Sequence, residues 1–239
     1  MKVLRKGRCT SDGYFRGWGL QFGDLRQRVR EDKLYREALK VMSGRSIVAE
    51  DNRINLFLIL RDFLKVIDFG HIVEFGSYKG GNALFMAYVV ARLYPGMNVY
   101  GFDTFQGMPE TDPAIDAHGA GDFADVDLDD LRRFAHLQKI NNVTFVKGLF
   151  QDTAPSHLPE VGKIALAHID CDIYSAVAYS YTSIKQFTVP GAYLVFDDAV
   201  YSSCLGATEA VEELAIRQDG LNSEQIFPHF VFRAPPHWA

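Results

Sequence analysis

The sequence predicts an α/β fold, with a mostly parallel central sheet that helices cover on both faces. Apolar stretches without polar alternation, such as residues 163–170 and 191–197, are typical of strands that are buried on both sides. Stretches with helical spacing of apolar residues separate these strands, which is the pattern of βαβ units with parallel strands. A length of 239 residues suits one sizeable domain.

Composition narrows the class of protein. A hydrophobic fraction of 48% is ordinary for a chain with a real core, and the net charge of -5 argues against broad nucleic-acid binding. Cys9, Cys171 and Cys204 form no CxxC pair, so we expect a reducing compartment with neither a disulfide framework nor a zinc site. No apolar run is long enough to span a bilayer, and no signal core follows the basic N-terminus. We therefore expect a cytoplasmic protein without membrane or nucleic-acid partners.

Residues 1–65 are expected to form an irregular and partly helical extension to a main domain at 66–239. Residues 24–43 show helical spacing, and a second helix carries Ile54 and Phe57, with Asp51 or Asn52 as its expected cap. We expect both helices to act through packing. The sequence leaves the oligomeric state open, with the irregular N-terminus as a candidate interface of a homo-oligomer.

The main domain begins with a βαβ unit. A strand at 71–76 runs into a glycine-bearing turn and a helix that ends at Pro95, and a second strand follows at 98–103. Residues 104–130 are acidic, rich in glycine and proline, and long for a connection. Long connections of this kind are often lids or binding loops, so we expect a lid there, with a disordered surface loop as the alternative.

Later elements repeat the alternation of helix and strand. The expected order is a helix at 127–138, a strand at 142–148, a strand at 163–170, a helix at 175–187, a strand at 191–197, a helix at 207–218 and a hairpin or edge strands at 225–233. Pro228 suits a turn or an edge rather than a central strand.

Carboxylates follow two of these strands. Asp170 and Asp172 come after the first, and Asp197 and Asp198 after the second. Because a helix joins the strands, they should be parallel neighbours whose carboxyl ends meet at the edge where ligands bind. Crowded like charges are costly unless a cation binds, and oxygen ligands favour Mg²⁺, Mn²⁺ or Ca²⁺ over zinc. Each aspartate alone could equally be a helix cap, but four together predict a divalent-cation site.

The turn after the first strand indicates the cofactor. Glu74, Gly76 and Gly80 form Glu-x-Gly-x-x-x-Gly, with Glu74 where a GxGxxG dinucleotide motif would begin, and the chain has no P-loop. The glycines let a ligand approach the backbone. An acidic residue here would repel a pyrophosphate, which favours a cationic or zwitterionic cofactor such as S-adenosylmethionine. Glu74 could then meet the amino-acid end of the cofactor, and Asp103 could accept both ribose hydroxyls.

Five segments of this sequence resemble the macrocin O-methyltransferase family of S-adenosylmethionine-dependent enzymes. They read VEFGSYKGGN at 73–82, GFDTFQGMP at 101–109, KGLFQDT at 147–153, HIDCDIY at 168–174 and PGAYLVFDD at 190–198. The resemblance implies a Rossmann-like class I methyltransferase fold. It also implies O-methylation of a glycoside-like small molecule, at a sugar hydroxyl of a natural product.

The resemblance also assigns residues. It implies that Asp170, Asp197 and Asp198 hold Mg²⁺ or another divalent cation. It implies cofactor contacts from the turn, from the end of the second strand and from a segment that flanks the adenine, namely Glu74, Gly76, Ser77, Gly80, Asp103, Phe150 and Gln151. Asp172 could orient the acceptor, ligate through water or act as a base.

Methyl transfer needs a base for the attacking hydroxyl. Asp170 is the first choice for this catalytic role and Asp172 the second, while His168 is expected to be a hydrogen-bonded core residue and Cys171 a buried filler. Lys79 either touches the cofactor carboxylate or points to water. Three alternatives remain open: an NAD-dependent sugar oxidoreductase, a methyltransferase for phenolic or catechol-like acceptors, and a non-catalytic nucleotide-binding module.

Overall fold

The computed structural model describes residues 24–42 and 44–238, so the expectations for residues 1–23, including Cys9, lie outside the described residues. Its strands are β1 (His71–Phe75), β2 (Val99–Asp103), β3 (Val143–Lys147), β4 (Ile164–Ile169), β5 (Thr188–Phe196) and β6 (Phe230–Arg233). In the described part of the chain they form one six-stranded sheet in the order β3-β2-β1-β4-β5-β6. All neighbouring strands are parallel except β5 and β6. The predicted mostly parallel sheet is confirmed.

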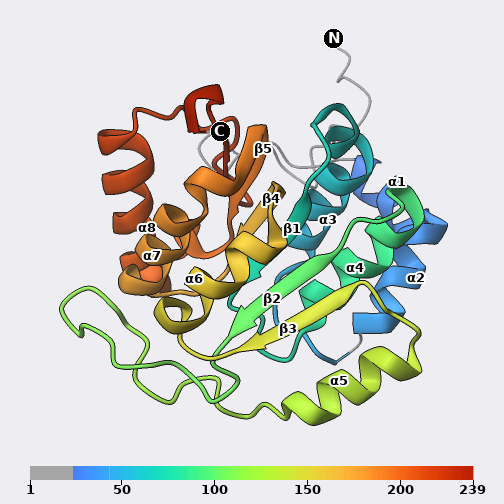
Figure 1. Ribbon diagram of the computed structural model, residues 1–239, viewed down its shortest axis with the longest axis horizontal. Coiled ribbons are helices and arrows are strands. Elements are labelled where there is room, and N and C mark those ends of the chain that lie inside the picture. Colours follow the sequence, from blue (N-terminus) through green and yellow to red (C-terminus); the bar gives the residue numbers. More distant parts are fainter. Residues whose placement is uncertain (1–23, 43, 239) are drawn as a thin grey trace, which may run out of the picture.

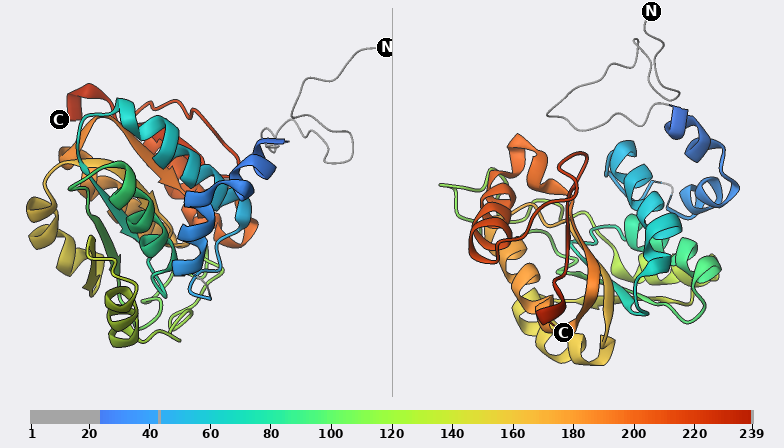
Figure 2. Two further views of the ribbon diagram at one scale, coloured as in Figure 1. Left: turned by 90° about the vertical axis from the view of Figure 1, so that its right-hand side faces the viewer. Right: turned by 90° about the horizontal axis from the view of Figure 1, so that it is seen from above.

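Helices cover both faces of this sheet. They are α1 (Asp24–Glu31), α2 (Lys33–Met42), α3 (Glu50–Leu58), α4 (Gly81–Leu93), α5 (Leu128–Leu137), α6 (Phe150–Val161), α7 (Tyr174–Ile184) and α8 (Leu205–Ala210), which continues as a π-helix over Val211–Gln218. The right-hand view of Figure 2 shows α6–α8 on one side of the sheet and α1–α4 on the other. Side chains alternate accordingly along β1, since Ile72 packs in the cluster of Phe85 and Val73 in that of Tyr181.

The helices before β1 are part of the same core and are not set apart from it. Tyr35 of α2 and Phe57 of α3 pack edge-to-face on Phe85 of α4, with ring centroids 5.8 Å and 6.3 Å from the Phe85 ring. The expected single helix at 24–43 is two helices. Asp32 separates them, because its side chain accepts the backbone N–H groups of Leu34 and Tyr35 and so caps α2.

Helix α3 corrects one detail of the sequence analysis. Its N-cap is Ala49, so Asp51 and Asn52 lie inside the first turn and neither caps it. Asn52 is instead a buried residue, 1% exposed, and its side chain reaches Asp197 at the carboxyl ends of the strands. A helix predicted to serve only packing therefore also brings a polar group to the edge of the sheet.

The connection from β2 to α5, residues 104–127, contains neither helix nor strand; we call it the lid segment. It is the long green loop at the lower left of Figure 1. Hydrogen bonds between the backbones of Met108, Gly121 and Asp122 close it on itself. Asp116 anchors it, because its buried carboxylate accepts the backbone N–H of Tyr174 at the start of α7 at 2.9 Å. The segment thus lies at the carboxyl ends of the strands, where the lid was expected.

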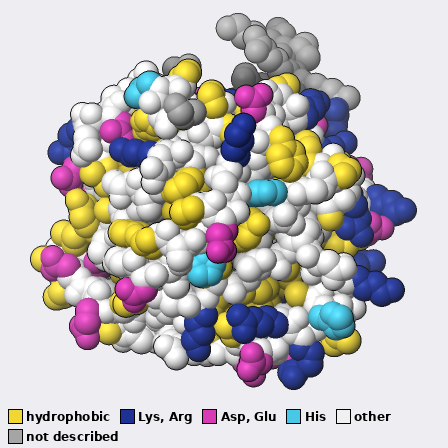
Figure 3. Space-filling view, in the orientation of Figure 1, with side chains coloured by type: hydrophobic (Ala, Val, Ile, Leu, Met, Phe, Trp, Pro, Cys, Tyr) yellow, Lys and Arg dark blue, Asp and Glu magenta, His cyan; other side chains and the backbone are white. Residues whose placement is uncertain are grey.

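The last strand and the surface complete the fold. β6 is an edge strand of the described sheet, and Pro228 precedes it, which agrees with the expectation of a turn or an edge. The Phe227–Pro228 peptide bond is cis. Acidic and basic side chains are interspersed over the face drawn in Figure 3. None of the helices in the described ranges has the length and apolarity that crossing a bilayer requires.

Candidate active site

A pocket of about 350 Å³ opens where β1, β2, β4 and β5 end, a volume typical of small-molecule sites. This is the edge at which the sequence analysis placed the ligand. All but one of the predicted site residues line it: Glu74, Gly76, Ser77, Asp103, Phe150, Gln151, Asp170, Asp172, Asp197 and Asp198. Residues from four strand ends, the first turn of α6 and the lid segment therefore face one space.

Two glycines of the turn after β1 have different structural roles. Gly76 has φ +89°, and a Cβ at this position would lie 1.7 Å from the carbonyl oxygen of Asp170, so only glycine lets the two strand ends approach. Gly80 is the exception among the predicted cofactor contacts, since it does not line the pocket. It is the left-handed N-cap of α4, and a Cβ there would meet Leu131 of α5 at 2.6 Å. Packing against α5 and the left-handed conformation at the start of α4 therefore explain why residue 80 is a glycine.

Glu74 is fully buried at the end of β1. Its Oε2 accepts the Ser77 hydroxyl at 2.8 Å, and its Oε1 lies 3.1 Å from Nδ1 of His168. Both oxygens are therefore held in place before any ligand binds. A carboxylate has further lone pairs, so Glu74 can still accept from the amino group of a cofactor.

Asp103 ends β2, and its carboxylate is positioned by the backbone. Its two oxygens accept the N–H groups of Tyr78 at 2.7 Å and Phe105 at 2.6 Å. Burial raises the pKa of Asp103 even though these hydrogen bonds act in the opposite direction.

Lys79 of the turn after β1 forms an ion pair with Asp125 of the lid segment, with Nζ 2.5 Å from Oδ2. The sequence analysis expected it either to touch the cofactor carboxylate or to point to water, and this ion pair is neither.

Asp170, Asp197 and Asp198 form the carboxylate trio of the pocket. Each offers an oxygen, and the three oxygens lie within 4.8 Å of one another. Burial, followed by the charges of neighbouring aspartates, raises the pKa of Asp170 and of Asp198 well above the usual range. A group of donors made only of carboxylate oxygens, crowded in a buried place, fits a hard divalent cation such as Mg²⁺ or Ca²⁺.

Asp197 differs from the other two because three side chains support it. Its Oδ1 lies 2.7 Å from His229 Nε2 and 2.9 Å from Asn52 Nδ2, which are hydrogen-bond distances. His168 Nε2 is 3.5 Å from the same oxygen, which is an ionic contact without a well-formed hydrogen bond. Burial opposes ionisation of Asp197, but the two histidines outweigh it and hold its pKa below the usual value. All three contacts are made to Oδ1 of Asp197, so none of these side chains contacts its Oδ2.

His168 joins the two halves of the pocket. Its Nδ1 faces Glu74 and its Nε2 faces Asp197, which connects the turn after β1 with the carboxylate trio. The expectation of a buried, hydrogen-bonded core histidine is confirmed, but the sequence analysis missed this bridging position. It also missed Asn52 and His229. Their separations of 145 and 32 residues from Asp197 leave no local motif by which to find them.

Asp172 lies beside the trio rather than within it. It has φ +59°, its backbone N–H donates to Asp198, and Cys204 donates to its Oδ1 at 3.4 Å. Burial raises its pKa, although the neighbouring His118 acts in the opposite direction. Burial also raises the pKa of Cys171, which keeps that thiol protonated and agrees with its expected role as a filler.

Comparison with known sequences gives two findings. A family model described as macrocin-O-methyltransferase matches residues 64–223. A curated relative from Streptomyces olivaceus, 8-demethyl-8-(2,3-dimethoxy-alpha-L-rhamnosyl)-tetracenomycin-C 4'-O-methyltransferase, is 28% identical over 150 residues, which cover 58% of this chain and 56% of that protein. The chain thus spans little more than half the length of this relative.

Solved methyltransferases share the fold. A calicheamicin methyltransferase matches with a TM-score of 0.61 at 20% identity over 93% of this chain and 97% of that one. The O-methyltransferase NovP matches with a TM-score of 0.65 at 19% identity over 84% and 97% of the two chains. An O-methyltransferase from Bacillus cereus in complex with SAH matches with a TM-score of 0.54 at 14% identity over 91% and 96%. The predicted Rossmann-like class I methyltransferase fold is confirmed.

Proposed function

This chain belongs to the macrocin O-methyltransferase family, and we propose that it transfers the methyl group of S-adenosylmethionine to a sugar hydroxyl of a natural product with the help of a divalent cation. One observation carries the proposal. A single pocket is lined both by the turn after β1 with Asp103 and by the trio of Asp170, Asp197 and Asp198. A methyl donor and an acceptor hydroxyl can therefore lie side by side.

The cofactor is proposed to bind across the ends of β1 and β2. The turn residues Glu74, Gly76 and Ser77 face its methionine end. Asp103, whose carboxylate the backbone already orients, accepts the ribose hydroxyls. Phe150 and Gln151, in the first turn of α6, flank the adenine. The absence of a GxGxxG motif fits a cofactor without a pyrophosphate.

Asp170, Asp197 and Asp198 would hold the cation. When bound, a divalent cation supplies Lewis-acid polarisation of the acceptor hydroxyl and lowers the pKa of that hydroxyl. Asn52, His168 and His229 fix the orientation of Asp197, so one member of the ligand set is preorganised.

Asp172 is our choice for the proton acceptor. Asp170 lies within the trio that would hold the cation, whereas Asp172 lines the same pocket from outside the trio. This order reverses the preference drawn from the sequence. As the hydroxyl oxygen bonds to the methyl carbon, the C–S bond breaks with its electron pair going to sulfur, and the hydroxyl proton passes to the Asp172 carboxylate. The products are the methyl ether and S-adenosylhomocysteine.

The acceptor is proposed to be a sugar because the name of the curated relative describes methylation of a rhamnosyl group. In this chain the pocket that holds the carboxylates is also lined by Met108, Pro109 and Phe123 of the lid segment and by Tyr201. Apolar and aromatic side chains here can pack on a sugar face or on the attached aglycone, while the carboxylate edge receives hydroxyls.

Mass spectrometry of products from S-adenosylmethionine with an isotopically labelled methyl group tests the proposal. We expect label on glycosides in a panel of glycosides and phenols, loss of transfer with a chelator, and recovery when Mg²⁺ is restored. Label only on phenols would contradict the acceptor class, and transfer that survives the chelator would contradict the metal dependence. Calorimetric binding of NAD but not of S-adenosylmethionine would overturn the function itself.

A further inference from the structure

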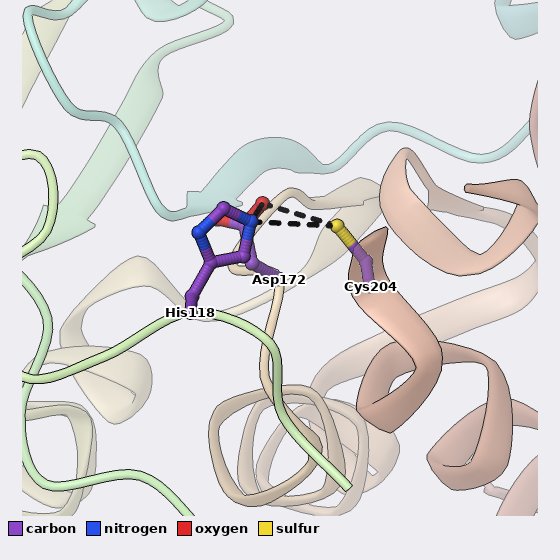
Figure 4. A group of neighbouring side chains, drawn as sticks. All are labelled: His118, Asp172 and Cys204. Atoms are coloured by element: carbon purple, nitrogen blue, oxygen red, sulfur yellow. Dashed lines mark hydrogen bonds and ion pairs between the residues drawn. The ribbon is translucent and has the colours of Figure 1, made fainter. Parts of the chain in front are cut away.

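A second cluster of metal-ligating side chains lies beside the pocket, outside the carboxylate trio. His118 of the lid segment, Asp172 after β4 and Cys204 before α8 converge there, as Figure 4 shows. Cys204 Sγ lies 3.4 Å from Asp172 Oδ1 and 3.9 Å from His118 Nε2, and His118 Nε2 lies 3.8 Å from Asp172 Oδ1. The same three atoms make all three contacts, so they form one triangle.

The size of this triangle fits one metal ion. With sides of 3.4, 3.8 and 3.9 Å, its centre lies about 2.1 Å from each corner. Zinc binds imidazole nitrogen and carboxylate oxygen at about 2.0–2.2 Å and thiolate sulfur at about 2.3 Å. An ion slightly out of the plane reaches all three donors with little movement of the side chains.

The second nitrogen of His118 provides independent support. His118 Nδ1 lies 3.3 Å from Asp122 Oδ2, and the same oxygen accepts the backbone N–H of Gly119 at 3.0 Å. Histidines that ligate metals commonly donate their other N–H to a carboxylate, which fixes the tautomer and directs the free lone pair at the ion. Here that arrangement leaves Nε2 as the acceptor nitrogen, facing Asp172 and Cys204.

The donor set differs in kind from the trio. One sulfur, one imidazole nitrogen and one carboxylate oxygen match zinc rather than Mg²⁺, which prefers oxygen alone. We propose that His118, Asp172 and Cys204 form a Zn²⁺ site separate from the oxygen-only site of Asp170, Asp197 and Asp198. The side chains of His118 and Asp172 are 23% and 19% exposed, so an ion can reach the site from solvent.

Ion uptake displaces one proton. Cys204 is a buried thiol that donates to Asp172, and burial raises its pKa. Zinc binds the thiolate, so the Zn–S bond replaces the S–H bond and the proton leaves to solvent. The hydrogen bond that joins Cys204 and Asp172 in the metal-free protein is thereby exchanged for two bonds to the same ion.

The site joins three segments that are far apart in the sequence. A bound ion would fasten His118 of the lid segment to the strand end and to the start of α8 (Figure 4). The bound ion would also occupy the carboxylate of Asp172. Zinc should therefore block proton acceptance by Asp172 and inhibit methyl transfer, an effect that rests on the proposed function. Binding of zinc itself does not depend on that function.

The direct test is titration of the metal-free full chain with Co²⁺, followed by competition with Zn²⁺. Cobalt replaces zinc and shows a thiolate-to-cobalt charge-transfer band only when a sulfur is bound. The variant that removes the sulfur is Cys204→Ala, with Cys204→Ser as a second choice should the first not fold. The matched control is Cys9→Ala with Cys171→Ala, which leaves Cys204 as the one cysteine of the chain.

We expect the charge-transfer band to report one sulfur-bound Co²⁺ per chain in the wild type, in the cysteine control and in Asp170→Asn, whether or not the trio also binds Co²⁺. Cys204→Ala should lose the band, and Asp122→Ala should weaken Zn²⁺ binding about tenfold or more. A band that persists without Cys204, or Zn²⁺ binding unchanged by Cys204→Ala, would overturn the proposal.

Methyl transfer measured without zinc tests the proposed function separately. Zinc inhibition of the wild type but not of Cys204→Ala would support the coupling of the two, and equal inhibition would contradict it.

Discussion

At the scale of single residues, the side chains that contact Asp197 have the clearest effect on the charge state of the pocket. One oxygen of this buried carboxylate receives contacts from Asn52, His168 and His229, which come from α3, β4 and the segment before β6. A buried charge without partners is costly, and removal of one partner leaves the others unsatisfied. These contacts keep Asp197 ionised and oriented while Asp170 and Asp198 resist ionisation.

The charge of His168 predicts a pH dependence of stability. Burial opposes its protonation, but Asp197 and Glu74 outweigh burial and raise the pKa of His168 to about 9. A raised histidine pKa gives stability that is fully present below the unfolded value near 6.5 and is lost as pH rises through 9. In chelator-treated protein, urea denaturation should show wild type losing up to about 3 kcal/mol across this range relative to His168→Gln. Parallel curves for the two proteins would contradict a charged His168.

The roles of Asp170 and Asp172 can be separated. Asp170→Asn removes a proposed cation ligand and should weaken Mg²⁺ binding, measured by calorimetry. Asp172→Asn should leave Mg²⁺ affinity nearly unchanged while methyl transfer falls about 10²–10⁴-fold. S-adenosylhomocysteine should bind both variants about as well as wild type. Equal loss of Mg²⁺ affinity in the two variants would place Asp172 within the cation site and contradict our assignment.

The sequence supported the prediction of the four aspartates but not of their partners. Asp170, Asp172, Asp197 and Asp198 directly follow apolar strands, so their location depends only on local pattern and on the parallel connection. The environments of His168, His229 and Cys204 depend on contacts across the whole fold. For example, Cys204 lies 32 and 86 residues from Asp172 and His118 along the chain, and no motif signals that they meet.

At the scale of elements, a buried hydrogen bond of Asp116 helps to anchor the lid segment. Asp116 Oδ1 accepts the first N–H of α7, and a Cβ on Gly206 of α8 would lie 1.9 Å from that oxygen. Asp116→Ala and Gly206→Ala should therefore both release the segment. The loss of about 1 kcal/mol should speed hydrogen exchange of the amides of Met108 and Gly121 about fivefold.

A matched control for this prediction lies within the lid segment. A Cβ on Gly119 would meet nothing within 4 Å, so Gly119→Ala adds the same methyl group without a clash. Its exchange rates should equal those of wild type, as measured by hydrogen-exchange mass spectrometry. Unchanged exchange in both Asp116→Ala and Gly206→Ala would show that the segment is anchored elsewhere.

Elements with a regular pattern were predicted well from the sequence. β4 is buried at all six positions, so its apolar run had one interpretation. The break between α1 and α2 was missed because Asp32 interrupts the helix without disturbing the apolar spacing on either side. The course of the lid segment follows from contacts with distant parts of the chain, such as those of Asp116 with Tyr174 and of Asp125 with Lys79. These contacts leave no periodic trace in the sequence.

At the scale of the whole molecule, two members of the carboxylate trio, Asp170 and Asp198, lower the stability of the metal-free fold. Burial, then the charges of Asp172 and Asp197, raises the pKa of Asp198, so ionised Asp198 costs stability at neutral pH. Asp198→Asn should therefore raise the unfolding free energy of metal-free protein, on the order of 1 kcal/mol. Mg²⁺ at one hundred times its dissociation constant should stabilise wild type by about 2.7 kcal/mol and the variant by less.

Asp125→Asn is the control for this prediction, because Asp125 is exposed and its pKa is lowered by its bond to Lys79. In thermal and urea denaturation this variant should gain no stability and should respond to Mg²⁺ as wild type does. A gain of the same size in Asp198→Asn and Asp125→Asn would mean that general charge reduction, not the trio, accounts for the effect.

The overall architecture was predictable because parallel strands and their connections obey strong topological rules. The place of the N-terminal helices was not predictable in the same way. They were expected as an extension, yet Tyr35 and Phe57 share a core with Phe85, and Asn52 reaches the pocket. Amphipathic spacing shows that a helix has a buried face, but it does not show which surface covers that face.

We propose that the ends of β4 and β5 jointly hold a divalent cation beside the cofactor. A crystal structure with Mg²⁺ and S-adenosylhomocysteine tests this arrangement most directly. We expect an ion about 2.0–2.1 Å from carboxylate oxygens of Asp170, Asp197 and Asp198, with the cofactor sulfur facing the space beside Asp172. A cofactor bound in that pocket with no ion between these three carboxylates, at saturating Mg²⁺, would contradict the account.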